Sequence, residues 1–286
     1  MNNNFITRLN KYTKERFPVF PAIIFSALFS SVGVLYSTKD YTLIAILSVV
    51  IFLFLFRVRL LDEIKDYSFD TQYHSHRPVQ RNLISLKEIK FLTILTIILE
   101  LIIQIFLGKL ALTFYLFLFF YHFLMYKNFF IKNFEEKNLF IYILLHQLIF
   151  LFYAFYVLVI NHANRLEVIA LHNADIFLIL FLPGYIYEIG RKCKHRISAT
   201  GEISSDTYIY QWGENKAFLF LMLLLLLQSF TLFALPMRIT LPLMIHLTLV
   251  LSLFPAFYLE KEKIIQYVDK WSMFLGLLGL ILILFL

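Results

Sequence analysis

The sequence predicts an all-α, polytopic membrane protein, built as a bundle of about nine transmembrane helices. Hydrophobic residues make up 60% of the 286 residues and only 16% are charged, whereas about a quarter of a soluble domain is charged. The mean hydropathy is +0.75. Apolar stretches recur from residue 18 to the C-terminus, so we expect one transmembrane domain over residues 1–286 and no separate soluble domain.

A hydrocarbon core of about 30 Å needs roughly 20 apolar residues per helix, and this length divides the chain into nine segments. The first segment follows a polar, basic stretch that ends at Arg16, and we interpret it as a retained helix rather than a cleaved signal. Short connections predict that spans one and two form an antiparallel hairpin, as do spans three and four. The expected spans are residues 18–37, 41–61, 89–107, 110–127, 139–160, 167–188, 216–235, 239–258 and 271–286.

The basic residues predict how these spans are oriented. With a cytoplasmic N-terminus, all but four of the 26 Lys and Arg residues lie on the cytoplasmic side, as the positive-inside rule requires. We therefore expect the C-terminus outside, in the inner or plasma membrane of a bacterium. The net charge of +7 is then the ordinary excess of a cytoplasmic face and indicates no nucleic-acid partner. The four outer basic residues are Lys39, Lys109, Arg165 and Arg238.

Two long cytoplasmic loops are expected, at about residues 62–88 and 189–215. In the first, Asp62, Asp66 and Asp70 are spaced i, i+4, i+8 and share one face if the second helix continues past the membrane. Together with the adjacent Glu63, they repel one another unless a cation neutralises them, and hard oxygen ligands in this number suit Mg²⁺. A solvated helix end, balanced by a neighbouring lysine, is the alternative.

Basic residues follow these acids in the same loop. Arg77 and Arg81 can each clamp phosphate oxygens with two parallel hydrogen bonds. The loop thus combines acids that can hold a metal with arginines that can hold an anion. This combination suits a metal-bound diphosphate. His74 and His76 are either metal ligands or hydrogen-bonded loop residues.

The second loop combines acids and bases again. Glu202 and Asp206 have i, i+4 spacing, and Glu188 stands at the mouth of the sixth span, before Arg191 and Lys192. A basic run after a span is also an ordinary topology determinant. The loop holds the only cysteine, Cys193, which excludes an intrachain disulfide and a Cys-rich metal site.

Polar residues inside spans are costly, and they usually face a cavity or a polar partner. Glu100 and Gln104 lie in the outer half of span three, and Asp175 lies in that of span six. They form either a patch that binds an acceptor or hydrogen bonds between helices. The possible acceptor or cavity residues are Tyr187, Glu188, Asp175 and Asn173.

The first loop resembles the first aspartate-rich motif of the UbiA-type intramembrane prenyltransferases. That motif has Asn or Asp, an acid or amide, two residues, Asp, three residues and Asp, with Arg-Pro shortly after. Here it reads Asp62-Glu63-x-x-Asp66-x-x-x-Asp70, followed by Arg77-Pro78. The family also has nine transmembrane helices, with its two motifs after the second and sixth, as expected here.

The second motif departs from the family pattern. The family commonly shows Tyr, then Lys-Asp-x-x-Asp and a further Gly-Asp, whereas this chain has Tyr187-Glu188 and later Glu202-x-x-x-Asp206. The Asp-x-x-x-Asp element is replaced by Glu-x-x-x-Asp, farther from the helix end. The ligands of a second metal and the identity of the acceptor therefore stay open.

The resemblance implies Mg²⁺-dependent transfer of an isoprenyl group from an isoprenyl diphosphate, with Asp66, Asp70 and Arg77 as catalytic residues. The expected partners are this diphosphate, membrane lipid and an unidentified acceptor. A terpene cyclase on the same scaffold is one alternative, and a non-enzymatic transporter or lipid-binding membrane protein is another. The residues implied to hold Mg²⁺ are Asp62, Glu63, Asp66 and Asp70 for one ion, and Glu202 and Asp206 for a second. The residues implied to bind the diphosphate are Arg77, Arg81, Arg191 and Lys192.

Overall fold

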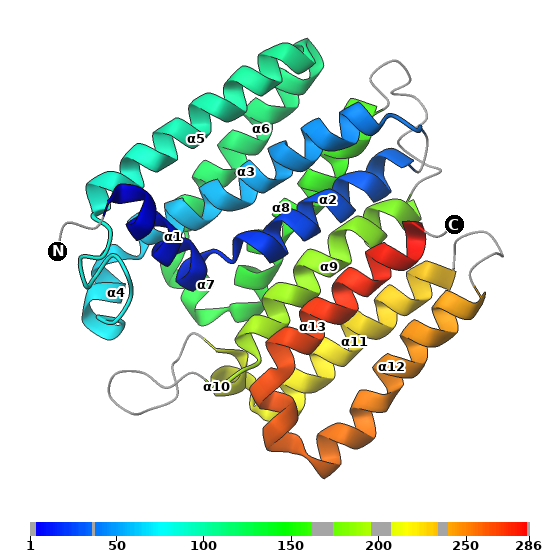
Figure 1. Ribbon diagram of the computed structural model, residues 1–286. Helices are drawn as coiled ribbons and strands as arrows, with labels where there is room; N and C mark the ends of the chain where they lie inside the picture. Colours follow the sequence, from blue (N-terminus) through cyan, green and yellow to red (C-terminus); the bar gives the residue numbers. More distant parts are fainter. Residues whose placement is uncertain (1–3, 36–37, 162–173, 196–206, 234–239, 285–286) are drawn as a thin grey trace. The chain divides into compact units, whose positions relative to one another are not determined.

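The computed structural model describes residues 4–35, 38–161, 174–195, 207–233 and 240–284 (Figure 1). Within these ranges every regular element is a helix and there is no strand. The prediction of an all-α protein is therefore confirmed for the described part of the chain.

The chain divides into two compact units, each described by itself. The first unit comprises residues 1–30 and 39–163. Most of α2 belongs to it, and the end of that helix belongs to the second unit. Its elements are α1 (Phe5–Arg16), α2 (Val19–Leu35), α3 (Tyr41–Lys65), α4 (Tyr67–Tyr73), α5 (Leu86–Leu107), α6 (Lys109–Tyr126), the 3₁₀ turn η1 (Asn128–Phe130), α7 (Lys132–Lys137) and α8 (Leu139–Asn161).

The second unit comprises residues 31–38 and 164–286. Its helices are α9 (Ala174–Lys192), α10 (Tyr208–Trp212), α11 (Glu214–Phe233), α12 (Thr240–Leu259) and α13 (Lys261–Leu284). Helices α9 and α13 lie side by side (Figure 1), and small residues bring them close together. A methyl group added at Gly190 would lie 1.8 Å from Ser272 Oγ, so only glycine fits that contact without movement.

Several helices have the length and composition of membrane spans. Six described helices are long and apolar enough to cross a bilayer, or up to seven if α1 and α2, which are bent by 67°, form one span. The structure thus supports a helical membrane protein, but it does not confirm the predicted count of about nine. The six spans are α3, α5, α6, residues Ile141–Asn161 of α8, residues Glu214–Thr231 of α11, and α13.

Local sequence signals explain where two of these spans begin. The Asp40 carboxylate accepts a hydrogen bond from the Leu43 amide at 2.9 Å and caps α3. Ser85 and Glu88 form a capping box at the start of α5, which satisfies amides that no helical carbonyl reaches. Helices α5 and α6 are separated only by Gly108, whose φ of 102° is favourable only for glycine. This confirms the predicted short connection between spans three and four.

Several helices extend beyond the predicted boundaries. Helix α3 continues to Lys65 rather than ending at 61, and α9 continues to Lys192 rather than ending at 188. Helix α13 begins at Lys261, whereas the apolar run predicted a start at 271. Hydropathy marks only the part of a helix that suits hydrocarbon, so charged turns that extend into water are missed.

Candidate functional site

The three aspartates of the first motif follow one another along a nearly continuous helix. The Asp66 amide donates to the Asp62 carbonyl oxygen at 2.9 Å, and the Asp70 amide donates to the Asp66 carbonyl oxygen at 2.8 Å. Asp66 is the single residue between α3 and α4. The i, i+4 backbone bonding therefore persists across this junction, and the three acids keep their helical spacing.

Two of the four motif acids are buried and paired with arginines. Glu63 is fully buried, and its Oε1 accepts a hydrogen bond from Arg16 Nε at 2.7 Å and another from Arg59. Asp70 is also buried and forms an ion pair with Arg77. Arg16 Nη2 lies 3.9 Å from Asp70 Oδ2, so this one guanidinium links both buried acids.

The other two motif acids are open to solvent. The Asp62 side chain is 45% exposed and lies 3.9 Å from Arg59 Nη1. Asp66 is also exposed. The pKa of Asp66 is nevertheless raised to about 6, first because surrounding protein atoms displace water from the carboxyl group and then because the Asp62 carboxylate repels its charge. A divalent cation at this position would relieve that repulsion.

One buried acceptor in this cluster has an unused lone pair. Glu63 Oε2 is buried and accepts no hydrogen bond from the described residues. The Tyr12 side chain is also fully buried here and lies close enough to Arg59 and Glu63 to interact electrostatically. A buried carboxylate oxygen without a hydrogen-bond donor is costly. The described side chains around Glu63 therefore do not satisfy all of its hydrogen-bond acceptors.

Two further arginine–carboxylate pairs join α1 to the rest of the first unit. Arg81 forms a fork with the Glu15 carboxylate, at 2.9 and 2.6 Å, and also donates to the His76 carbonyl oxygen at 2.7 Å. Arg8 forms a similar fork with Glu88, at 2.9 and 2.6 Å. Arg81, predicted to bind diphosphate, thus has a protein carboxylate as its partner in this state.

In the second unit the predicted polar residues interact locally. Glu188 accepts two hydrogen bonds from Arg191, at 2.9 and 2.7 Å, and lies 3.6 Å from Lys192 Nζ. The Lys192 ammonium also lies 5.7 Å from the centre of the Tyr208 ring, and the neighbouring Tyr187 is partly buried on α9. The predicted residues Asn173, Glu202 and Asp206 lie outside the described residues, as does the side chain of Asp175.

The described residues include no group of three or more His, Cys, Asp or Glu side chains placed to hold a metal ion. The pairing of Glu63 and Asp70 with arginines accounts for this, because each of these carboxylates is turned toward a guanidinium. Asp62 and Asp66 still offer two hard oxygen ligands. Mg²⁺ is commonly held by one or two carboxylates, together with water and substrate phosphates, so these two residues fit such an ion.

A second buried polar cluster lies within the spans of the first unit. Arg57 and Glu100 are fully buried, and Arg57 Nε lies 2.9 and 2.8 Å from the two Glu100 carboxylate oxygens. The Tyr115 hydroxyl donates to Glu100 Oε2 at 3.1 Å, and the Tyr156 hydroxyl donates to Gln104 Oε1 at 2.5 Å. For Glu100 and Gln104 the structure therefore shows hydrogen bonds between helices.

Sequence analysis missed several members of the first cluster. The sequence places Arg16 only in the polar N-terminal segment, and it places Arg59 only among the cytoplasmic basic residues. Arg59 lies three residues before Asp62, so helical spacing was a usable signal for that pair. No local signal pointed to Arg16, because its contact with Glu63 joins residues 47 positions apart.

The fold and the first cluster together define a helical membrane protein with an acid–arginine cluster at the end of one span. The acid–arginine cluster consists of Asp62, Glu63, Asp66 and Asp70 with Arg16, Arg59 and Arg77. No protein-family model, no curated protein and no solved structure matches the chain.

Proposed function

We propose that the protein is a Mg²⁺-dependent intramembrane prenyltransferase of the UbiA type, which transfers an isoprenyl group from an isoprenyl diphosphate to an unidentified acceptor. One observation carries the proposal: at the end of an apolar span, the exposed Asp62 and Asp66 lie near Arg59, and the adjacent buried Asp70 pairs with Arg77 and Arg16. The carboxylates suit Mg²⁺ and the arginines suit phosphate oxygens, so the combination suits a magnesium-bound diphosphate.

The diphosphate would interact with the acids of the cluster through Mg²⁺ and with its arginines directly. Asp62 and Asp66 would hold Mg²⁺, which supplies positive charge that stabilises the departing diphosphate. Arg77 is 16% exposed in its side chain and would turn from Asp70 toward the phosphate oxygens. Arg59 and Arg16 keep Glu63 neutralised, so that buried carboxylate would not repel the incoming anion.

The reaction requires separation of charge near a dry environment. The carbon–oxygen bond of the allylic diphosphate breaks, and its electron pair leaves on the diphosphate oxygen. The allylic cation then forms a bond with a nucleophilic atom of the acceptor, which releases a proton. The apolar spans beside the cluster would keep water from capturing the cation first.

The test uses the full-length protein, purified in mild detergent and supplied with geranyl, farnesyl or geranylgeranyl diphosphate and Mg²⁺. We expect Mg²⁺-dependent release of diphosphate that EDTA abolishes and added Mg²⁺ restores. Asp66→Asn and Asp70→Asn should each fold and lose this activity. Asp40→Asn is the matched control, because it makes the same chemical change at the other end of α3 and asparagine is an equally good helix cap.

The products separate the remaining possibilities. Prenylated product that appears only with an added acceptor supports a transferase, whereas cyclic hydrocarbon from diphosphate alone identifies a cyclase. If Asp66→Asn and Asp70→Asn release as much diphosphate as the unaltered protein does, the cluster is not catalytic. A transporter or lipid-binding protein would then be the better interpretation.

A further inference from the structure

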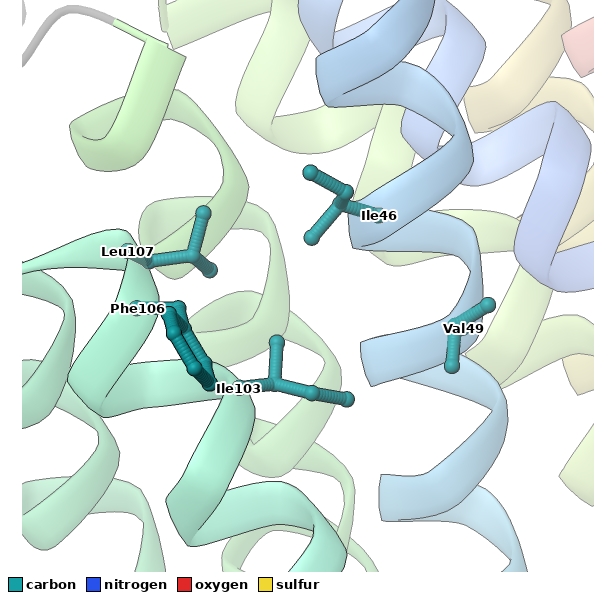
Figure 2. A pocket seen from close by; sticks show the side chains of 5 residues that line it. All are labelled: Ile46, Val49, Ile103, Phe106 and Leu107. Carbon is teal, nitrogen blue, oxygen red and sulfur yellow. The ribbon is translucent and has the colours of Figure 1, made fainter.

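An apolar groove lies between two spans of the first unit, well away from the acid–arginine cluster. It is open on one side, has a volume of about 320 Å³, and is lined by Ile46 and Val49 of α3 and by Ile103, Phe106 and Leu107 of α5. Figure 2 shows Ile103 and Leu107 pointing toward α3 and Ile46 pointing toward α5. All five side chains are apolar, so the groove offers nothing to a polar ligand.

The lining residues place the groove at one end of the spans. They come from the beginning of α3 and the end of α5, so these two helix ends lie on the same side. The acid–arginine cluster is at the other end of α3, a helix of 25 residues, or about 37 Å in length. The groove therefore faces the opposite half of the bilayer.

Tyr41 marks the boundary of the membrane near the groove. It is the first residue of α3 and is 71% exposed. Tyrosine favours the level of the lipid headgroups. From Tyr41 to Ile46 the helix rises about 8 Å, so the groove opens just below that level.

Two lysines flank this end of the spans. Lys39 precedes α3, and Lys109 begins α6 two residues after Leu107. Both are exposed, and no ion pair joins either of them to another described residue. The nearby acid, Asp40, caps α3 through its bond to the Leu43 amide. The headgroup level above the groove thus carries a net positive charge.

We infer that this groove binds one acyl chain of an anionic phospholipid, whose phosphate group lies between Lys39 and Lys109. Five side chains make too small a surface for a stable protein interface, which needs about 800 Å² from each partner. A single lipid chain matches the purely apolar lining. The lysines select an anionic headgroup, since each basic residue near the net negative charge of such lipids adds about 1 kcal/mol.

The test measures which lipid stays with the protein. The full-length chain is reconstituted into vesicles of phosphatidylcholine and phosphatidylglycerol in equal parts, extracted in mild detergent and examined by native mass spectrometry. We expect the protein to retain phosphatidylglycerol preferentially. The double variant Lys39→Gln/Lys109→Gln should reduce that preference about thirtyfold. The control variant Lys87→Gln/Lys90→Gln, with the same charge change at the start of α5, should leave the preference unchanged.

A second pair of variants tests the groove itself. Ile103→Trp fills it and should abolish retention of the phospholipid, whereas Ile98→Trp alters an exposed position of α5 outside the groove and should have no effect. Equal retention of both phospholipids, or unchanged retention in Ile103→Trp, would overturn the inference. A change from dimer to monomer in Ile103→Trp, without loss of phospholipid, would identify the groove as an interface between copies instead. None of these outcomes depends on the proposed enzymatic activity.

Discussion

The buried ion pair between Arg57 and Glu100 gives the sharpest test of how the first unit is held together. Both side chains are fully buried, and Tyr115 is the further hydrogen-bond donor to Glu100. Replacing Arg57 by Met leaves a buried carboxylate without its counter-charge, which costs about 3 to 5 kcal/mol. Glu100→Leu leaves an unpaired buried guanidinium and should cost a similar amount.

The double variant Arg57→Met/Glu100→Leu should be much less destabilised than either single variant. It removes both charges, so neither is left unpaired in an apolar setting. What remains is the loss of an acceptor for the Tyr115 hydroxyl, about 1 to 2 kcal/mol. We therefore expect the double variant to be more stable than each single variant by at least about 1 kcal/mol.

The measurement is unfolding in mixed micelles with increasing sodium dodecyl sulfate, followed by far-ultraviolet circular dichroism. Tyr115→Phe is the matched control, because it removes one hydrogen bond and leaves the ion pair intact, at a cost of about 1 kcal/mol. If the double variant is no more stable than the single variants, the two charges do not stabilise each other and the reasoning fails.

Three further predictions address the acid cluster, the orientation and the second unit. Because burial raises the pKa of Asp66 to about 6, ionisation of Asp66 destabilises the folded protein progressively between the ordinary carboxyl pKa of about 4 and pH 6, so Asp66→Asn should raise stability more at pH 7.5 than at pH 4.5. Equal effects at both pH values would contradict this. In intact cells, a membrane-impermeant maleimide should label Lys109→Cys but not Ser68→Cys; the reverse pattern would invert the proposed orientation. Gly279→Ala would place a methyl group 2.2 Å from Gln228 Nε2, which donates to a buried carbonyl, and should cost roughly 1 to 3 kcal/mol in the same unfolding assay. Adding Gln228→Ala should remove most of the steric clash, and an unchanged stability in Gly279→Ala would show that the helices move apart freely.

The sequence predicted the helical architecture well, because hydropathy over about 20 residues measures the property that places a helix in a membrane. It also predicted the register of Asp62, Asp66 and Asp70, since spacing along a helix is a local property. Helix α4 was not predicted, because its seven residues lack an apolar periodicity. The start of α13 was missed for a related reason, since its first turns are charged.

The partners of the acids were beyond the reach of sequence reasoning. The four motif acids looked equivalent, yet Glu63 and Asp70 are buried against arginines while Asp62 and Asp66 are exposed. This difference depends on where α1 lies, and that is a tertiary contact. Arg57 shows the same limit. The sequence places it among the basic residues of the cytoplasmic side, but the structure buries it beside Glu100.

The ion pairs that fasten α1 differ in their access to water, and dissolved salt therefore acts on them unequally. The Arg81–Glu15 pair is 40% and 42% exposed, whereas Glu63 in the Arg16–Glu63 pair is completely shielded. Mobile ions weaken the first and hardly reach the second. Rising ionic strength would thus weaken the exposed contact of α1 while its buried contact persists, so that salt alone would not release the helix.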